Sequence, residues 1–183
     1  MKKTMIFKPA IVSVVLGMGA MLAASTATAD DDAPASLHED AVSLIQAVEI
    51  AKNATGGVAF EAERDAERGQ AVYEIELLKT PGEEIHAVVN ATTGEVMFTK
   101  RRDHDDHHGH DDELMEDAMW LNGIQGGTLL SLEQAAMNIE SEFGGKVWSI
   151  GQDDHYGQPS YDIELLDANG RHVETRINAK VVK

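Results

Sequence analysis

Tyr73-Glu74-Ile75-Glu76-Leu77-Leu78 returns 88 residues later as Tyr161-Asp162-Ile163-Glu164-Leu165-Leu166. The match continues in both directions without an insertion, and a repeat of this length is one folding unit. The sequence therefore predicts two tandem copies of one module. Other positions that recur at the same offset are Ser43-Leu44 with Ser131-Leu132, Gln46-Ala47 with Gln134-Ala135, Gly56-Gly57 with Gly144-Gly145, Gly82 with Gly170, and Asn90-Ala91 with Asn178-Ala179.

The repeated stretch itself alternates with a period of two residues. Tyr73, Ile75 and Leu77 point to one face of a strand, and the acids between them point to the other. The outward acids are Glu74, Glu76, Asp162 and Glu164. Two interpretations stay open for them: the solvated face of a sheet, or an acidic surface that meets a basic partner.

A helix precedes this strand in each copy. Leu44, Ala47, Val48 and Ala51 follow the spacing of one helix face, as do Leu132, Ala135, Ala136, Ile139 and Phe143 in the second copy. Ser43 and Ser131 stand at the predicted N-caps, where a hydroxyl accepts from a free backbone N–H. The glycine pairs end both helices.

The remaining segments complete a small antiparallel sheet. Short strands are predicted at 58–60 and 146–148, polar turns at 63–70 and 151–158, and third strands at 85–90 and 173–178. A fourth strand is predicted at 95–99 in the first copy, and its counterpart in the second copy is short or absent. The predicted fold is α+β: two tandem modules, each with one N-terminal helix packed on a 3–4-stranded antiparallel sheet. Modules of about 55–60 residues are near the lower limit for an independent core. We therefore expect the two to stabilise each other or to share a homodimer interface.

The order of elements, ending in Asn90-Ala91-Thr92-Thr93-Gly94-Glu95-Val96, resembles the PepSY domain. The second copy keeps Tyr161-Asp162-Ile163-Glu164-Leu165 and Asn178-Ala179 but lacks the Thr-Gly turn. The resemblance is to a stand-alone exported protein with tandem PepSY domains, related to the PepSY region of thermolysin-like protease propeptides. It implies a binding or regulatory module that modulates an exported peptidase or an envelope sensor domain, and no catalytic activity.

The N-terminus is typical of a secretory signal peptide. Lys2, Lys3 and Lys8 precede or flank an apolar run, and Ala27-Thr28-Ala29 supplies the small-residue end, so we expect cleavage after residue 29 and a periplasmic location. The remainder carries 12 basic against 32 acidic residues and no cysteine. Such a chain repels nucleic acid and anionic membranes. No second long apolar run follows, so no membrane span is expected in the mature form.

A histidine- and aspartate-rich tract separates the two copies. Imidazole with neighbouring carboxylates suits Zn, Cu or Ni, which predicts a weakly held divalent metal in a flexible segment. Two alternatives remain, a charged linker and a response to pH through histidines whose pKa values neighbouring acids raise. The predicted ligands are His104, His107, His108 and His110, with Asp105, Asp106 and Asp111 as secondary ligands.

A short helix at 113–121 follows the tract and has Met115 and Met119 beside its apolar side. It either packs onto a module or presents a methionine patch for a partner or copper. The predicted organisation is a signal peptide at 1–29, an acidic segment at 30–42, a first module at 43–99, a linker at 100–128 and a second module at 129–183.

No catalytic signature is recognisable in the sequence. His38-Glu39-Asp40 and His172-Val173-Glu174 are interpreted as isolated pairs. The predicted function is therefore a periplasmic binding or regulatory protein that needs no cofactor and whose partner is another exported or envelope protein. The alternative is a periplasmic protein that binds or buffers divalent metal through the tract.

Overall fold

The computed structural model describes residues 34, 36–103, 111–155 and 157–182, and these form an α+β fold with one antiparallel sheet. The first half contains the 3-10 helix η1 (Leu37–Glu39), α1 (Leu44–Thr55), β1 (Val58–Glu67), β2 (Gln70–Thr80), β3 (Glu83–Asn90) and β4 (Val96–Asp103). The second half contains α2 (Asp111–Gln125), α3 (Leu132–Phe143), β5 (Lys146–His155), β6 (Gln158–Leu166) and β7 (His172–Asn178).

Both predicted helices begin and end where the sequence indicated. Ser43 and Ser131 each accept from the backbone N–H three residues later, and Gln46 and Gln134 return a side-chain acceptor to the cap N–H. Gly56 ends α1 with φ 75° in the left-handed region. The predicted core faces of both helices are buried, apart from the half-buried Phe143.

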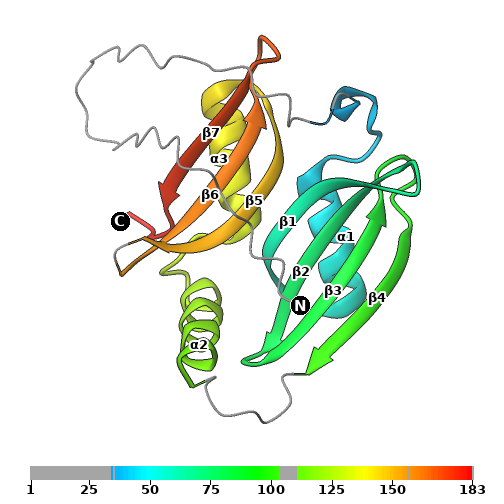
Figure 1. The fold of residues 1–183 in the computed structure, drawn as a ribbon. Helices are drawn as coiled ribbons and strands as arrows, with labels where there is room; N and C mark the ends of the chain where they lie inside the picture. Colours follow the sequence, from blue (N-terminus) through cyan, green and yellow to red (C-terminus); the bar gives the residue numbers. More distant parts are fainter. Residues whose placement is uncertain (1–33, 35, 104–110, 156, 183) are drawn as a thin grey trace, which may run out of the picture.

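The seven strands form a single sheet in the order β4-β3-β2-β1-β5-β6-β7, and α1 and α3 cover one of its faces (Figure 1). The sequence predicted two modules with separate sheets. The halves are instead joined along β1 and β5, which pair antiparallel at Glu61 with Gly151, Ala62 with Ile150 and Glu63 with Ser149. Lys52 on α1 forms an ion pair with Glu133 on α3 on the helix side of this seam.

The register of the seam relates the halves by an approximate two-fold axis. Ala62 and Ile150, which face each other across the seam, are 88 residues apart and so occupy equivalent positions in the repeat. A pair of equivalent residues on antiparallel strands lies on a local dyad. The chain therefore joins its two repeats as an isologous dimer joins two subunits.

The first strand of each half is longer than predicted, and the predicted polar turns were wrong. β1 and β5 run for ten residues each, and the β1–β2 turn contains only Arg68 and Gly69, both with positive φ. The segment from Glu63 was predicted as a turn because it is rich in charged residues, yet it continues a strand in which half-buried acids alternate with Ala62 and Arg64. Both of those side chains are buried, so the segment is a strand with two different faces.

The predicted fourth strand of the first half is present, and it extends through Asp103. In the described part of the second half the chain after β7 takes a different course. Leu130 donates to Ala179, and Val181 donates to Thr128, so the end of the chain pairs with the segment that precedes α3.

The helix between the halves is longer than predicted and contacts both of them. Trp120 is buried against Tyr161 of the second half. Asp117 accepts from the backbone N–H of Gly82 in the β2–β3 turn of the first half. Met115 and Met119 are exposed. The helix is thus anchored by Trp120, while its methionines remain on the surface.

Candidate functional site

The sheet face opposite α1 and α3 holds the densest group of charged side chains in the described residues. The strand register aligns two rows of neighbouring positions across all seven strands. The rows are Phe98, Val88, Glu74, Glu63, Ser149, Glu164 and Glu174, and beside it Lys100, His86, Glu76, Glu61, Gly151, Asp162 and Arg176. We call these fourteen positions the acidic face.

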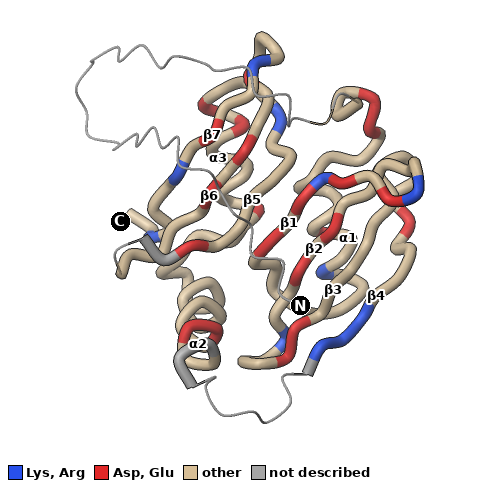
Figure 2. The backbone as a smooth tube through the Cα atoms, in the orientation of Figure 1, with Lys and Arg blue, Asp and Glu red and all other residues tan. Residues whose placement is uncertain are grey.

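The charge on this face is unevenly distributed. On the four central strands, β2, β1, β5 and β6, six of the eight positions are acidic and none is basic. The basic members, Lys100 and Arg176, are on the outer strands β4 and β7. Figure 2 shows the acidic positions on the central strands and the basic run at the end of β4. A cation would meet its strongest attraction at the seam between the halves.

Glu61 lies at the middle of this charge. Burial, and then the nearby carboxylates of Glu76, Glu63, Glu74 and Glu84, raise its pKa from 4.5 to about 7. A carboxylate with so many acidic neighbours is costly to ionise. A proton on Glu61, or a cation placed over the centre of the acidic face, would therefore reduce this repulsion.

In the second half, arginine neutralises part of this face. Arg176 on β7 forms two hydrogen bonds with Asp162 on β6, and an ion pair of 3.0 Å with Asp153 on β5. The equivalent position in the first half is Val88, which is fully buried. In the first half the arginine comes from another strand, because Arg102 on β4 forms an ion pair of 3.4 Å with Glu76.

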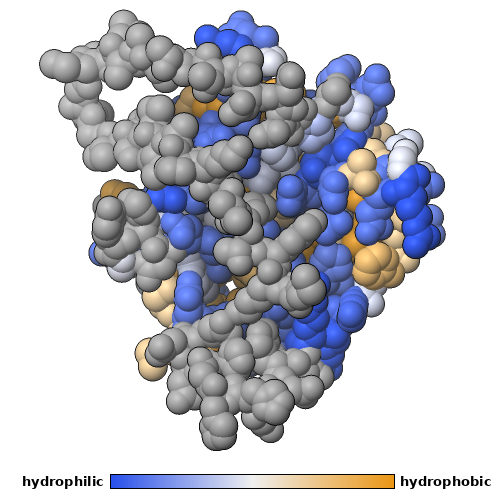
Figure 3. Space-filling view, in the orientation of Figure 1, coloured by the Kyte–Doolittle hydropathy of each residue, from blue (hydrophilic) through white to orange (hydrophobic). Residues whose placement is uncertain are grey.

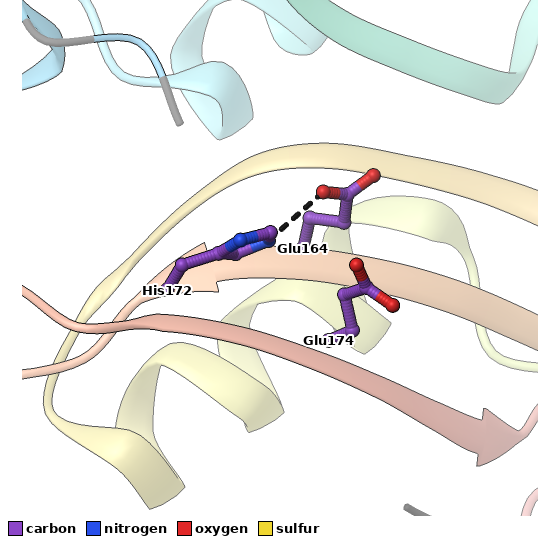
Figure 4. A group of neighbouring side chains, drawn as sticks. All are labelled: Glu164, His172 and Glu174. Carbon is purple, nitrogen blue, oxygen red and sulfur yellow. Dashed lines mark hydrogen bonds and ion pairs between the residues drawn. The ribbon is translucent and has the colours of Figure 1, made fainter. Parts of the chain in front are cut away.

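Three side chains of β6 and β7 come together at the edge of the acidic face. His172 Nε2 lies 3.0 Å from Glu164 Oε2, and Glu174 is the direct cross-strand neighbour of Glu164. Ligand atoms of the three residues lie within 4.8 Å of one another (Figure 4). Burial raises the pKa of Glu164, with His172 opposing the effect. The expectation that His172-Val173-Glu174 is isolated was wrong, because the β6–β7 hairpin supplies Glu164.

The first half carries the same three residue types at the equivalent positions Glu76, Glu84 and His86. There His86 lies between two acids of β2: its Nδ1 is 3.8 Å from Glu76 and its Nε2 is 3.9 Å from Glu74. The nearby imidazole of His86, together with the charge of Arg102, lowers the pKa of Glu76 against the effect of burial. The imidazole thus separates two carboxylates and does not converge with them on one point.

A buried ion pair closes the other face of the first half, and the sequence did not suggest it. Arg64 on β1 donates two hydrogen bonds to Asp40, at 2.7 and 3.0 Å, and a third to Ser36. The Tyr73 hydroxyl also donates to Asp40. Pairing with Asp40 raises the pKa of Arg64. These residues hold the segment before α1 against the sheet.

The metal ligands predicted from the sequence fall mostly outside the described residues. His104, His107, His108, His110, Asp105 and Asp106 lie there, and Asp111 is described only as the first residue of α2. The metal prediction for the tract stays a prediction. The predicted signal peptide at 1–29 lies outside the described residues as well.

The surface beside β4 has a different character. Met97 and Phe98 are exposed there, and Figure 3 shows hydrophobic surface on this side of the molecule next to hydrophilic surface over the sheet. No helix among the described residues is long and apolar enough to span a membrane.

Comparison with known proteins identifies the family. The family model for PepSY, the peptidase propeptide and YPEB domain, matches residues 41–99 and 129–181. The chain belongs to the PepSY family. Each PepSY match covers one helix and the strands that follow it. The family consists of propeptide-like modules that are generally not catalytic.

A solved structure also matches the PepSY chain. It is the crystal structure of a "putative lipoprotein" from Clostridium difficile 630, with 19% sequence identity and a TM-score of 0.41, and the alignment covers 79% of this chain and 92% of that one. No curated protein matches the PepSY chain.

Proposed function

We propose that this tandem PepSY protein is an exported, non-enzymatic regulator that binds a basic segment of a second exported or envelope protein on its acidic face. The observation that carries the proposal is the distribution of charge on the central strands, where six of eight positions are acidic and none is basic. The family supports a regulatory module. An exported peptidase or the sensor domain of an envelope receptor is the class of partner that we propose.

The electrostatics favour a cationic partner over a neutral one. Several acids surround Glu61 and raise its pKa. Its direct cross-strand neighbours are Glu76 and Gly151, and neither of them brings a positive charge. A lysine or arginine placed over the seam would stabilise the ionised form of Glu61 and of the acids around it. Charge complementarity of this kind increases the association rate and selects against acidic partners.

The geometry favours an elongated segment. The two rows cross the strands of both halves, so a bound chain can contact equivalent acids on either side of the local dyad. The outermost positions, Lys100 and Arg176, limit the attractive region to the central strands. A basic segment that lies across β2, β1, β5 and β6 fits this pattern.

Calorimetric titration with a synthetic peptide rich in lysine and arginine tests the proposal. We expect binding to the full mature chain that weakens steeply with added salt. Combined replacement of Glu63→Gln and Glu74→Gln should reduce the affinity at least about tenfold, or about 1.4 kcal/mol. The matched control is the combined replacement of Glu49→Gln on α1 and Glu142→Gln on α3, two exposed acids, which removes the same charge. Equal losses in both variants would show that only net charge matters and would contradict a specific site.

A further inference from the structure

Glu164, His172 and Glu174 bring three ligand atoms close together, and the binding of a basic segment does not by itself require this arrangement. An imidazole nitrogen and two carboxylates are a donor set that suits Zn²⁺, whereas Ca²⁺ and Mg²⁺ prefer oxygen ligands alone. We propose that these three residues bind one divalent transition-metal ion of the Zn²⁺ type. Glu164 and Glu174 are also positions of the acidic face, but this inference rests on their convergence with His172 and not on the binding of a partner protein. It is separate from the predicted metal ligands at 104–111.

The sheet itself places the three ligands. Glu164 and Glu174 are directly opposite each other on β6 and β7, and His172 is two residues from Glu174, so all three side chains project from one face. In Figure 4 the His172 ring and both carboxylates lie on the same side of the two strands. No helix or loop has to move to bring the ligands together.

The distances require only small side-chain adjustments. Ligand atoms in a tetrahedral zinc site are about 3.4 Å apart, given metal–ligand bonds of about 2.0–2.2 Å. Here Nε2 of His172 and Oε2 of Glu164 are 3.0 Å apart, and all three ligand atoms lie within 4.8 Å of one another. The ion takes the place of the proton that His172 and Glu164 share. Glu174, which is exposed, then rotates inward to complete the set.

The surroundings of the imidazole supply a second, independent observation. Trp148 on β5 packs its ring against His172, with centroids 5.8 Å apart, and it is only 5% exposed. Its indole Nε1–H has no hydrogen-bond partner within the described part of the chain. A zinc ion with three protein ligands keeps a fourth position for water. In the proposed site, this water is the acceptor for the buried N–H of Trp148.

The two halves differ at this site in a way that provides a matched control. The residues equivalent to Glu164, His172 and Glu174 are Glu76, Glu84 and His86. His86 presents a different ring nitrogen to each of two carboxylates, at 3.8 and 3.9 Å. Among the described residues, the group of three ligand atoms within 4.8 Å of one another is the one in the second half, so the proposed metal site lies there.

Fluorescence of Trp148 tests the proposal in the full mature chain. Replacement Trp120→Phe leaves Trp148 as the sole tryptophan, and Co²⁺ serves as a paramagnetic probe that occupies Zn²⁺ sites and quenches a nearby indole. We expect saturable quenching by Co²⁺ that Zn²⁺ reverses. In the same background, Glu174→Gln should weaken Co²⁺ binding at least about tenfold, and His172→Gln should abolish it. Because Glu174 is exposed, its replacement keeps the fold even if that of His172 does not.

Two control variants make the outcome decisive. His86→Gln, at the counterpart site in the first half, should leave the quenching unchanged. The combined replacement of His104, His107, His108 and His110 by alanine should also leave it unchanged. Quenching that persists in both Glu174→Gln and His172→Gln, or that disappears with the tract histidines, would overturn the proposal. Absence of quenching at micromolar Co²⁺ would overturn it as well.

Discussion

The first three strands of the two halves follow the same path through the sheet, yet the same three residue types on them are arranged differently. In the second half His172 bonds to Glu164 at 3.0 Å, and Glu174 completes a convergent group. In the first half His86 separates Glu74 and Glu76. The difference arises because the order of histidine and glutamate on the third strand is exchanged, from Glu84-x-His86 to His172-x-Glu174. A duplicated fold can thus acquire two kinds of site without a change of backbone.

The halves also differ in how they close the end of the sheet near the repeated tyrosine. Tyr73 donates to Asp40, which is already paired with the buried Arg64. Tyr161 donates to the backbone carbonyl of Leu130. The tyrosine of the first half therefore bonds to a buried ion pair, and the tyrosine of the second half bonds to a neutral backbone carbonyl. Unfolding measurements can compare the stability that each arrangement contributes.

The largest expected effect comes from breaking the ion pair of the first half. Asp40→Ala leaves Arg64 buried without its partner, which should reduce the free energy of unfolding by about 3–5 kcal/mol. The control is Thr128→Ala at the equivalent position of the second half, where the side chain is exposed and the cost should be within about 1 kcal/mol. Urea unfolding of both variants makes the comparison. Similar losses would show that the halves do not differ in this respect.

The next effect concerns Glu61, whose equivalent in the second half is the uncharged Ser149. Its pKa of about 7 in the folded state exceeds the value of 4.5 expected when the chain is unfolded. The folded state therefore holds the proton more tightly, and stability falls as the pH rises from about 4.5 through 7. Because the side chain is partly exposed, we expect a loss of about 1–2 kcal/mol from this group.

Replacement Glu61→Gln should remove that loss. The variant should be more stable than the wild type by about 1–2 kcal/mol at pH 8 and nearly equal to it at pH 4.5. Thermal unfolding across this range measures the effect, with Glu142→Gln on α3 as the control. A constant difference at all pH values would mean that Glu61 does not titrate near 7.

The smallest effect compares two acids at equivalent positions of the acidic face. Asp162→Asn disrupts the two hydrogen bonds with the partly buried Arg176 and should cost about 1–2 kcal/mol. Glu74→Gln in the first half affects a side chain that is 31% exposed and 3.9 Å from His86, so it should change stability by no more than about 0.5 kcal/mol. Chemical denaturation of the two variants tests the difference, and a reversed order would contradict the assignment of ion pairs.

Local features of the sequence were sufficient to predict the helices, their caps and the buried side of the repeated strand. Ser43 with Gln46 and the glycine after the helix act within a few residues, so a periodic pattern reveals them. The seam was not predictable, because the pairing of Ala62 with Ile150 depends on contacts between distant segments. The same reason explains why the Asp40–Arg64 pair was missed.

The candidate metal site was missed for a more specific reason. His172 and Glu174 were considered without the strand that precedes them, although the hairpin at Asn169-Gly170 places Glu164 directly opposite Glu174. Aligning the two strands of this predicted hairpin around the turn would have brought the three residues together. The predicted ligands at 104–111 remain a separate prediction that the described residues do not test.

The central claim is that the acidic face is where a partner binds, and photocrosslinking in living cells tests it most directly. A photoreactive amino acid at Glu63, in the middle of the face, should give a crosslink to one exported protein, and the same residue at Glu142 on α3 should not. The crosslink at 63 should weaken when Glu74 and Glu164 are both replaced by lysine, since these changes reverse the local charge. Equal crosslinking at both positions, or a crosslink at 63 that survives the charge reversal, would contradict the claim.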